Sequence, residues 1–125
     1  MARILVAEDD DAMRQFLASA LGRAGHLVET AADGREATDL LAAQGFDLLL
    51  ADVVLPGMDG IEVARRAMRE NAGLEVMFIT GFAAVALKAR DGLPGRPKVL
   101  SKPFHLRDLV REIEHLVGAR RATPA

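Results

Sequence analysis

The sequence predicts a doubly wound α/β domain, in which five parallel strands alternate with five helices. Short apolar runs recur along the chain, and each is followed by a longer stretch whose apolar residues step by three and four. The clearest run, at 46–52, is apolar on both faces, which is typical of a parallel strand covered on both sides. A length of 125 residues, half of them hydrophobic, suits one compact domain with its own core.

The expected strands cover 3–7, 26–30, 46–52, 74–80 and 97–101, and the expected helices lie around 13–24, 37–41, 61–68, 82–90 and 106–117. Alternation of this kind gives a parallel sheet with helices on both faces. We expect one domain over 1–118 and a short, flexible tail over 119–125.

Polar residues at the element boundaries are expected to have local roles. Asp10 or Asp11 is expected to cap the first helix, and Asp59-Gly60 to form a turn and cap. The three histidines have no spacing typical of metal ligands, and we interpret them as surface or capping residues: His26, His105 and His115.

Composition excludes several classes of protein. The chain has no cysteine, so disulfides and thiolate metal sites are ruled out. Its net charge of −2 and its lack of tryptophan and tyrosine argue against nucleic-acid binding. The first apolar run is too short for a signal peptide or a membrane span. We therefore expect a cytoplasmic protein.

Reactive polar residues end four of the five expected strands. Glu8 and Asp9 follow the first strand, Asp52 ends the third, Thr80 ends the fourth, and Lys102 follows the fifth. Ligand sites of open parallel sheets form at the carboxyl ends of the strands, near the point where the strand order reverses. We therefore expect these side chains to meet at one edge of the sheet.

Three neighbouring carboxylates repel one another and need cations to stay ionised. Lys102 supplies one charge, and a hard divalent ion such as Mg²⁺ would supply the rest, because Mg²⁺ prefers oxygen ligands. Asp9 and Asp52 are the expected direct ligands, Glu8 is expected to act through water, and the backbone carbonyl of Val54 completes the set.

Four motifs, in this order and at these strand ends, resemble the receiver domain of two-component response regulators. They are the pair Glu8-Asp9, Asp52 within "LLLADVVLPGMDG", Thr80 within "FITG", and Lys102 within "LSKPF". The resemblance covers about 3–117. It implies the flavodoxin-like receiver fold with strand order 2-1-3-4-5.

The resemblance also implies a role for each matching residue. Asp52 would be the phosphoacceptor, Glu8 and Asp9 would hold Mg²⁺, Thr80 would bind the phosphoryl oxygens, and Lys102 would pair with the phosphoryl group or with Asp52. The Lys102–Pro103 peptide bond would be cis. The phosphoryl donor would be a histidine kinase or a histidine phosphotransferase.

The resemblance places the output surface on the fourth helix and the fifth strand and helix. The stretch 81–89 is unusually apolar, so we consider both a tightly packed helix and a protein docking surface. The candidate output residues are Phe82, Val85, Leu87 and Val99. Many members of the family have an aromatic switch residue where this chain has Val99, so the usual coupling from threonine to that residue is in doubt.

Within the family, "MFITGFAAVAL" and "KVLSKPFHLRDLV" resemble a group of single-domain regulators from alphaproteobacteria. In that group the unphosphorylated form binds the unfoldase ClpX and promotes ClpXP proteolysis, often at a cell pole. An alternative is a phosphotransfer intermediate, or a receiver that binds a motor or other target when phosphorylated. An inactive scaffold is a third possibility, although the complete set of acids, threonine and lysine argues against it.

A true enzyme, a Mg²⁺-dependent phosphohydrolase with an aspartyl nucleophile, is also conceivable. Such enzymes commonly carry a second acid two residues after the nucleophile, and here Val54 occupies that position and has no proton to give. We therefore expect a phosphoacceptor signalling module rather than an enzyme.

Overall fold

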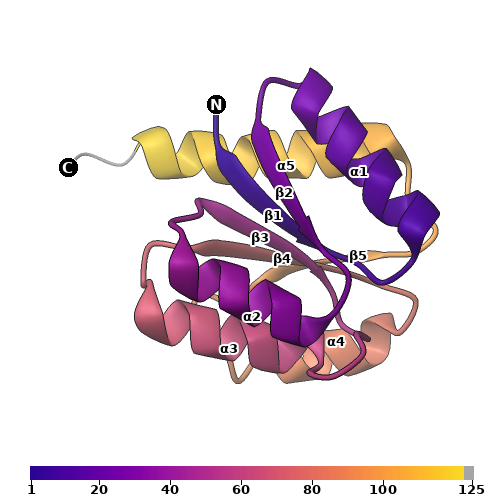
Figure 1. The fold of residues 1–125 in the computed structure, drawn as a ribbon, viewed down its shortest axis with the longest axis vertical. Coiled ribbons are helices and arrows are strands. Elements are labelled where there is room, and N and C mark those ends of the chain that lie inside the picture. Colours follow the sequence, from indigo (N-terminus) through magenta and orange to yellow (C-terminus); the bar gives the residue numbers. More distant parts are fainter. Residues whose placement is uncertain (123–125) are drawn as a thin grey trace.

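The computed structural model describes the backbone of residues 1–122 and the side chains of residues 1–118. Strands and helices alternate strictly along the described chain (Figure 1). In chain order the elements are β1 (Arg3–Ala7), α1 (Asp11–Arg23), β2 (Leu27–Ala31), α2 (Gly34–Ala43), β3 (Leu48–Asp52), α3 (Gly60–Glu70), β4 (Glu75–Thr80), α4 (Ala83–Arg90), β5 (Lys98–Ser101) and α5 (Leu106–Ala122).

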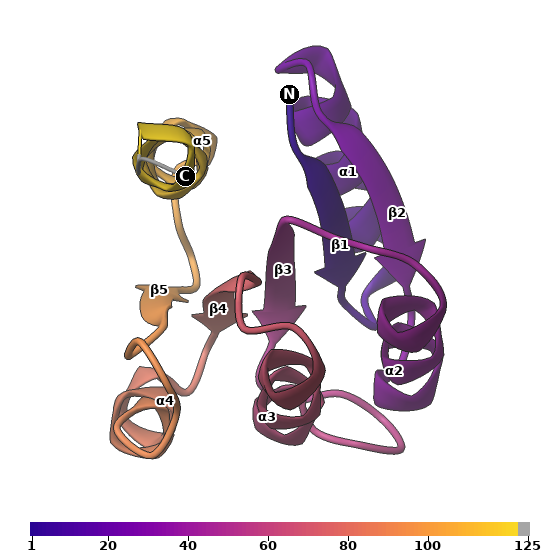
Figure 2. The ribbon, with the colours of Figure 1, turned by 90° about the vertical axis from the view of Figure 1, so that its left-hand side faces the viewer.

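The five strands form one parallel sheet in the order β2-β1-β3-β4-β5, which confirms the predicted fold. Helices α1 and α5 lie on one face, and α2, α3 and α4 lie on the other (Figure 2). The chain reverses direction across the sheet between β1 and β3, so the carboxyl ends of these two central strands form the expected position for a site.

An apolar layer fills the space on each side of the sheet. Leu49 and Phe78 face α2, α3 and α4, whereas Leu50 and Ile79 face α1 and α5. Strand β3 is buried at every residue, as its continuous apolar run predicts. Full burial of each such side chain contributes about 1.5–3 kcal/mol, so this strand anchors the residue at its end, Asp52.

Aspartates cap three of the helices at the same edge of the sheet. The side chains of Asp10, Asp33 and Asp59 accept hydrogen bonds from backbone N–H groups in the first turns of α1, α2 and α3, at 2.8–2.9 Å. These bonds satisfy donors that have no partner within the helix. Helix α4 begins after Phe82 and has no side-chain cap.

The prediction that His26 lies on the surface is wrong. Its ring is buried: Nδ1 accepts a hydrogen bond from the Ala2 backbone N–H at 3.1 Å, and Nε2 lies 2.8 Å from Glu114 Oε1 on α5. Because Nδ1 accepts a hydrogen bond, it carries no proton, and the ring N–H lies on Nε2. The physical reason is a contact across 88 positions of sequence, which no local pattern reveals.

Strand β1 starts where it was expected, and the other four strands start one or two residues later than expected. Helix α5 extends to Ala122, into the segment expected to be a flexible tail, and 123–125 lie outside the described residues. None of the helices within the described part of the chain is long and apolar enough to cross a membrane.

Candidate functional site

Strand register brings the predicted site residues to one edge of the sheet. Ala7 pairs with Ala51, so Glu8 and Asp9 follow β1 at the level where Asp52 ends β3. Thr80 ends β4 opposite Ser101, and the Lys102 backbone N–H donates to the Thr80 carbonyl at 2.8 Å. One carboxylate oxygen from each of Glu8, Asp9 and Asp52 lies within 4.8 Å of the other two.

The Lys102 ammonium joins two of these carboxylates. Its Nζ donates to Glu8 Oε1 at 2.6 Å and to Asp52 Oδ2 at 2.7 Å. The Glu8 side chain is 1% exposed, whereas Asp9 is open to solvent. The Lys102–Pro103 peptide bond, which precedes α5, is cis.

Burial raises the pKa of the Glu8 carboxyl above its ordinary value, although hydrogen bonds from Lys102 and from the Asp10 backbone N–H act in the opposite direction. Burial by itself would lower the pKa of Lys102. Hydrogen bonds to Asp52 and Glu8 outweigh that effect, so the pKa of Lys102 is raised and the ammonium stays charged.

The donor set fits a hard divalent cation. It offers carboxylate oxygens and neither imidazole nor thiolate, which matches the preference of Mg²⁺ and similar ions. Three carboxylates face one ammonium, so an added cation would relieve repulsion between them. Asp9 at the solvent side leaves the cluster accessible to an ion that keeps part of its water shell.

The loop after Asp52 is held by contacts that sequence reasoning missed. The Val54 backbone N–H donates to Asp52 Oδ1 at 3.0 Å, and the Gly60 N–H donates to the Val53 carbonyl at 2.8 Å. A Cβ at Gly60 would lie 2.0 Å from the Asp52 carbonyl oxygen, and one at Gly34 would lie 1.9 Å from that of Met58. The two glycines therefore allow α2 and α3 to approach this loop closely.

Arg14 is a second residue that the sequence did not indicate. Its Nη1 donates to the Glu8 carbonyl at 3.0 Å, and its Nη2 donates to Asp11 Oδ1 at 2.6 Å. The spacing of Asp11 and Arg14 on one helix face gives a signal for their ion pair, but not for the contact with Glu8, the residue that follows β1. Arg14 thus fixes the backbone that carries the acidic pair.

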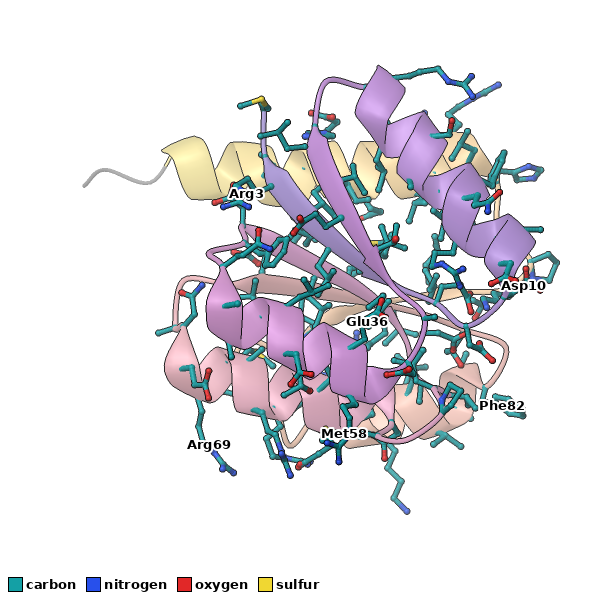
Figure 3. The ribbon with its side chains drawn as sticks, viewed as in Figure 1. Arg3, Asp10, Glu36, Met58, Arg69 and Phe82 are labelled. Carbon is teal, nitrogen blue, oxygen red and sulfur yellow. The ribbon has the colours of Figure 1, made fainter. Side chains whose placement is uncertain are left out.

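The fourth strand connects the site to α4 through one hydrogen bond. Thr80 is fully buried, and its Oγ1 accepts from the Phe82 backbone N–H at 2.9 Å. Asp10 and Phe82, at the starts of α1 and α4, lie at the same side of the molecule (Figure 3). Phe82, Val85 and Leu87 are strongly exposed, whereas Val99 is half-buried and packs against the core.

Residues 4–114 match the family described as the response regulator receiver domain. The chain belongs to this family. It is 56% identical over 119 residues to the response regulator receiver protein CpdR of Brucella abortus, covering 95% of this chain and 99% of that protein. The receiver family is thus established by sequence, and CpdR is a relative that the match spans almost completely.

Other comparisons place the same domain in larger proteins and in a metal complex. The response regulator MprA of Mycolicibacterium vanbaalenii is 38% identical, and the match covers 98% of this chain but 52% of MprA. The response regulator protein TrrA of Thermotoga maritima, in complex with Mg²⁺-BeF, has a TM-score of 0.81 at 26% identity, covering 93% of this chain and 99% of TrrA. Receivers of this fold therefore occur with a divalent metal bound.

Proposed function

We propose that this chain is a phosphorylation-controlled binding module of a two-component phosphorelay, with Asp52 as its phosphoacceptor. The observation that carries the proposal is the Asp52 carboxylate at the end of a fully buried strand, 2.7 Å from the Lys102 ammonium and clustered with Glu8 and Asp9. The family match and the metal complex of TrrA support it.

In this proposal, an Asp52 carboxylate oxygen attacks the phosphorus of a phosphohistidine on a histidine kinase or a histidine phosphotransferase. The P–N bond breaks and a mixed acyl phosphate forms on Asp52. Glu8, Asp9, Asp52 and the Val54 carbonyl would hold Mg²⁺, which supplies positive charge beside the phosphoryl oxygens when bound. Lys102 keeps its charge in this site, so it can pair with the phosphoryl group.

Thr80 is the proposed link to the surface. Its Oγ1 accepts a hydrogen bond from the Phe82 N–H, so its own hydroxyl proton remains to donate to a phosphoryl oxygen. A shift of Thr80 toward that oxygen would pull on the start of α4, which has no side-chain cap. The signal then reaches Phe82, Val85 and Leu87 without an aromatic residue at position 99.

The proposed output is regulated proteolysis in the cytoplasm. The unphosphorylated form would engage ClpX and promote ClpXP proteolysis, with recruitment to a cell pole, and phosphorylation would end this interaction. The 56% identity with CpdR over nearly its whole length supports this choice. Aspartyl phosphohydrolases commonly carry a second acid two residues after the nucleophile, and Val54 at that position has no proton to give. This argues for a signalling module rather than a phosphohydrolase.

Phosphorylation is tested by labelling the chain with acetyl phosphate in the presence of Mg²⁺. Asp52→Asn should abolish labelling, whereas Asp39→Asn, a control on the exposed surface of α2, should label as the wild type does. Labelling that persists in Asp52→Asn would refute the assignment of the phosphoacceptor.

The output is tested with purified ClpX, with and without beryllofluoride and Mg²⁺ as a mimic of the acyl phosphate. Binding only without the mimic supports a CpdR-like output, and Asp52→Ala should then bind ClpX under both conditions. Binding of a partner only with the mimic would favour the alternative, a phosphotransfer intermediate or a receiver that is active when phosphorylated.

A further inference from the structure

A hollow on the surface lies at the opposite end of the sheet from Asp52. It has a volume of about 510 Å³ and is formed where β4 and β5 begin, beside the end of α4 and one side of α5. Strand β4 separates it from Thr80 by five residue steps, roughly 16 Å. Its size is typical of pockets that bind small molecules.

Positive charge dominates the lining of this hollow. Four permanent cations face two carboxylates: Arg90, Arg96, Lys98 and Arg111 against Glu75 and Glu112. Lys98 Nζ lies 3.7 Å from Glu112 Oε1, so that lysine is already partly paired. Once that pair is set aside, three arginines face the single carboxylate of Glu75, which leaves an excess of two positive charges in a protein whose net charge is −2.

Arg90, which lines the hollow, carries a buried donor without a partner. It is the last residue of α4 and is half-buried, and its Nε atom is buried without a hydrogen-bond partner. Buried guanidinium donors are nearly always paired, so an orphan of this kind calls for an explanation. Because this atom has less than 1 Å² of solvent-accessible surface, a bound anion would become its acceptor only after the Arg90 side chain turned into the hollow.

Arg96 adds an independent observation. Its φ is +46°, and among the described residues it is the one residue other than glycine with a positive φ. It follows Gly95, whose φ is +74°, in the turn that leads into β5. Strained backbone of this kind gathers at sites that clamp ligands. The ion pair of Arg96 with Asp91, at 3.2 Å, joins two exposed side chains and holds the arginine weakly.

We propose that this hollow binds a small molecule with a diphosphate group, of the size of a nucleoside diphosphate. Planar guanidinium groups match phosphate oxygens with two parallel hydrogen bonds, and three arginines line this hollow. Val76, Pro97 and Leu116 supply apolar surface in the same hollow. A pocket with apolar walls and a few converging charges is typical of a small-molecule site.

The binding is tested by an NMR titration of the full chain with ADP and, separately, with inorganic pyrophosphate. The buffer contains EDTA, so that no metal carries phosphate to Asp52. We expect saturable shifts of the amides of Gly95, Arg96, Lys98 and Arg111, with no change at Glu8 or Thr80. Binding of both probes assigns the recognition to the diphosphate, whereas binding of ADP alone adds the nucleoside to it.

Substitutions of single arginines test whether these side chains bind the anion. Arg111→Gln and Arg90→Gln should each weaken binding about tenfold, the loss expected for one charge-assisted contact. Arg66→Gln, on the exposed surface of α3, is the matched control and should bind as the wild type does. Arg111 is exposed on α5, so its variant should keep the fold even where Arg90→Gln does not.

Three results would overturn the proposal. The first is that neither ADP nor pyrophosphate causes saturable amide shifts. The second is that the amide shifts centre on Lys102 and Thr80. The third is saturable binding of a hexaglutamate peptide where pyrophosphate and ADP do not bind, because this would identify the hollow as a protein interface. A fall in affinity with added salt supports the proposal, since anion binding at an open site is screened.

Discussion

Helices α3 and α4 follow neighbouring strands and cover the same face of the sheet, yet they are anchored very differently. Helix α3 is capped by Asp59 and buries five residues, including Ile61, Val63 and Ala64. Helix α4 has no side-chain cap and buries one residue, Ala86. Val85 within it and Phe82 just before it are each 60% exposed, and Leu87 is 43% exposed.

The difference shows that apolar content does not determine how firmly a helix is held. In α3 the apolar residues share one face and meet the sheet, whereas in α4 they are spread around the helix axis. The two helices make different contacts at the same site. Helix α3 holds the loop after Asp52, and the Phe82 backbone N–H just before α4 donates a hydrogen bond to Thr80 Oγ1.

The largest expected contrast comes from adding a methyl group near the start of each helix, at Gly60 for α3 and at Gly81 for α4. Gly60→Ala should destabilise the fold by about 3 kcal/mol, because the new Cβ meets the Asp52 carbonyl oxygen. Gly81→Ala, next to α4, meets nothing within 4 Å and should change stability by less than about 0.5 kcal/mol. Urea denaturation measures both, and equal losses would contradict the contrast.

Removing the cap of α3 should have a smaller effect. Asp59→Ala leaves the Glu62 backbone N–H without its 2.9 Å partner and should lower the free energy of unfolding by about 1 kcal/mol. Asp59→Asn, which keeps an acceptor oxygen, is the control in the same urea experiment. A loss of the same size in both variants would show that charge, rather than the cap bond, is responsible.

Titration of Glu8 should change the free energy of unfolding of the protein. Its pKa in the folded chain is raised above the ordinary value of 4.5, so the folded state binds this proton more tightly than the unfolded chain. The stabilisation is fully present below pH 4.5 and is lost as the pH rises through the raised pKa. Without Mg²⁺, Glu8→Gln should remove this dependence and be more stable than the wild type at neutral pH.

That comparison is made by urea denaturation of both proteins at a series of pH values. The advantage of Glu8→Gln should vanish below pH 4.5, where both side chains are neutral. An advantage that is the same at every pH would show that the effect comes from packing rather than from the proton.

The smallest effect is expected at the start of α4. Phe82→Ser removes an exposed ring and should change the free energy of unfolding by less than about 0.5 kcal/mol. The same variant should weaken binding to the output partner if this ring forms part of the docking surface. A large loss of stability would instead show that α4 is anchored as firmly as α3.

Local patterns predicted most of the fold because they act over short distances. The apolar run before Asp52, the three-and-four steps of α5 and the cap at Asp59 are each visible within a few residues. They also placed Glu8 and Lys102 at strand ends, although their side chains meet from positions 94 residues apart. The parallel sheet supplies that step, because it brings the carboxyl ends of its strands to one edge.

The sequence alone determined the order of elements, the edge that carries the acidic cluster and the family. The tertiary structure decided the buried ring of His26, the close approach at Gly60, and the loose attachment of α4. Each of these depends on what lies across space: Glu114 beside the histidine, the Asp52 carbonyl beside the glycine, and solvent beside Val85. Residue spacing records the path of a helix or strand, but not the surfaces that pack against it.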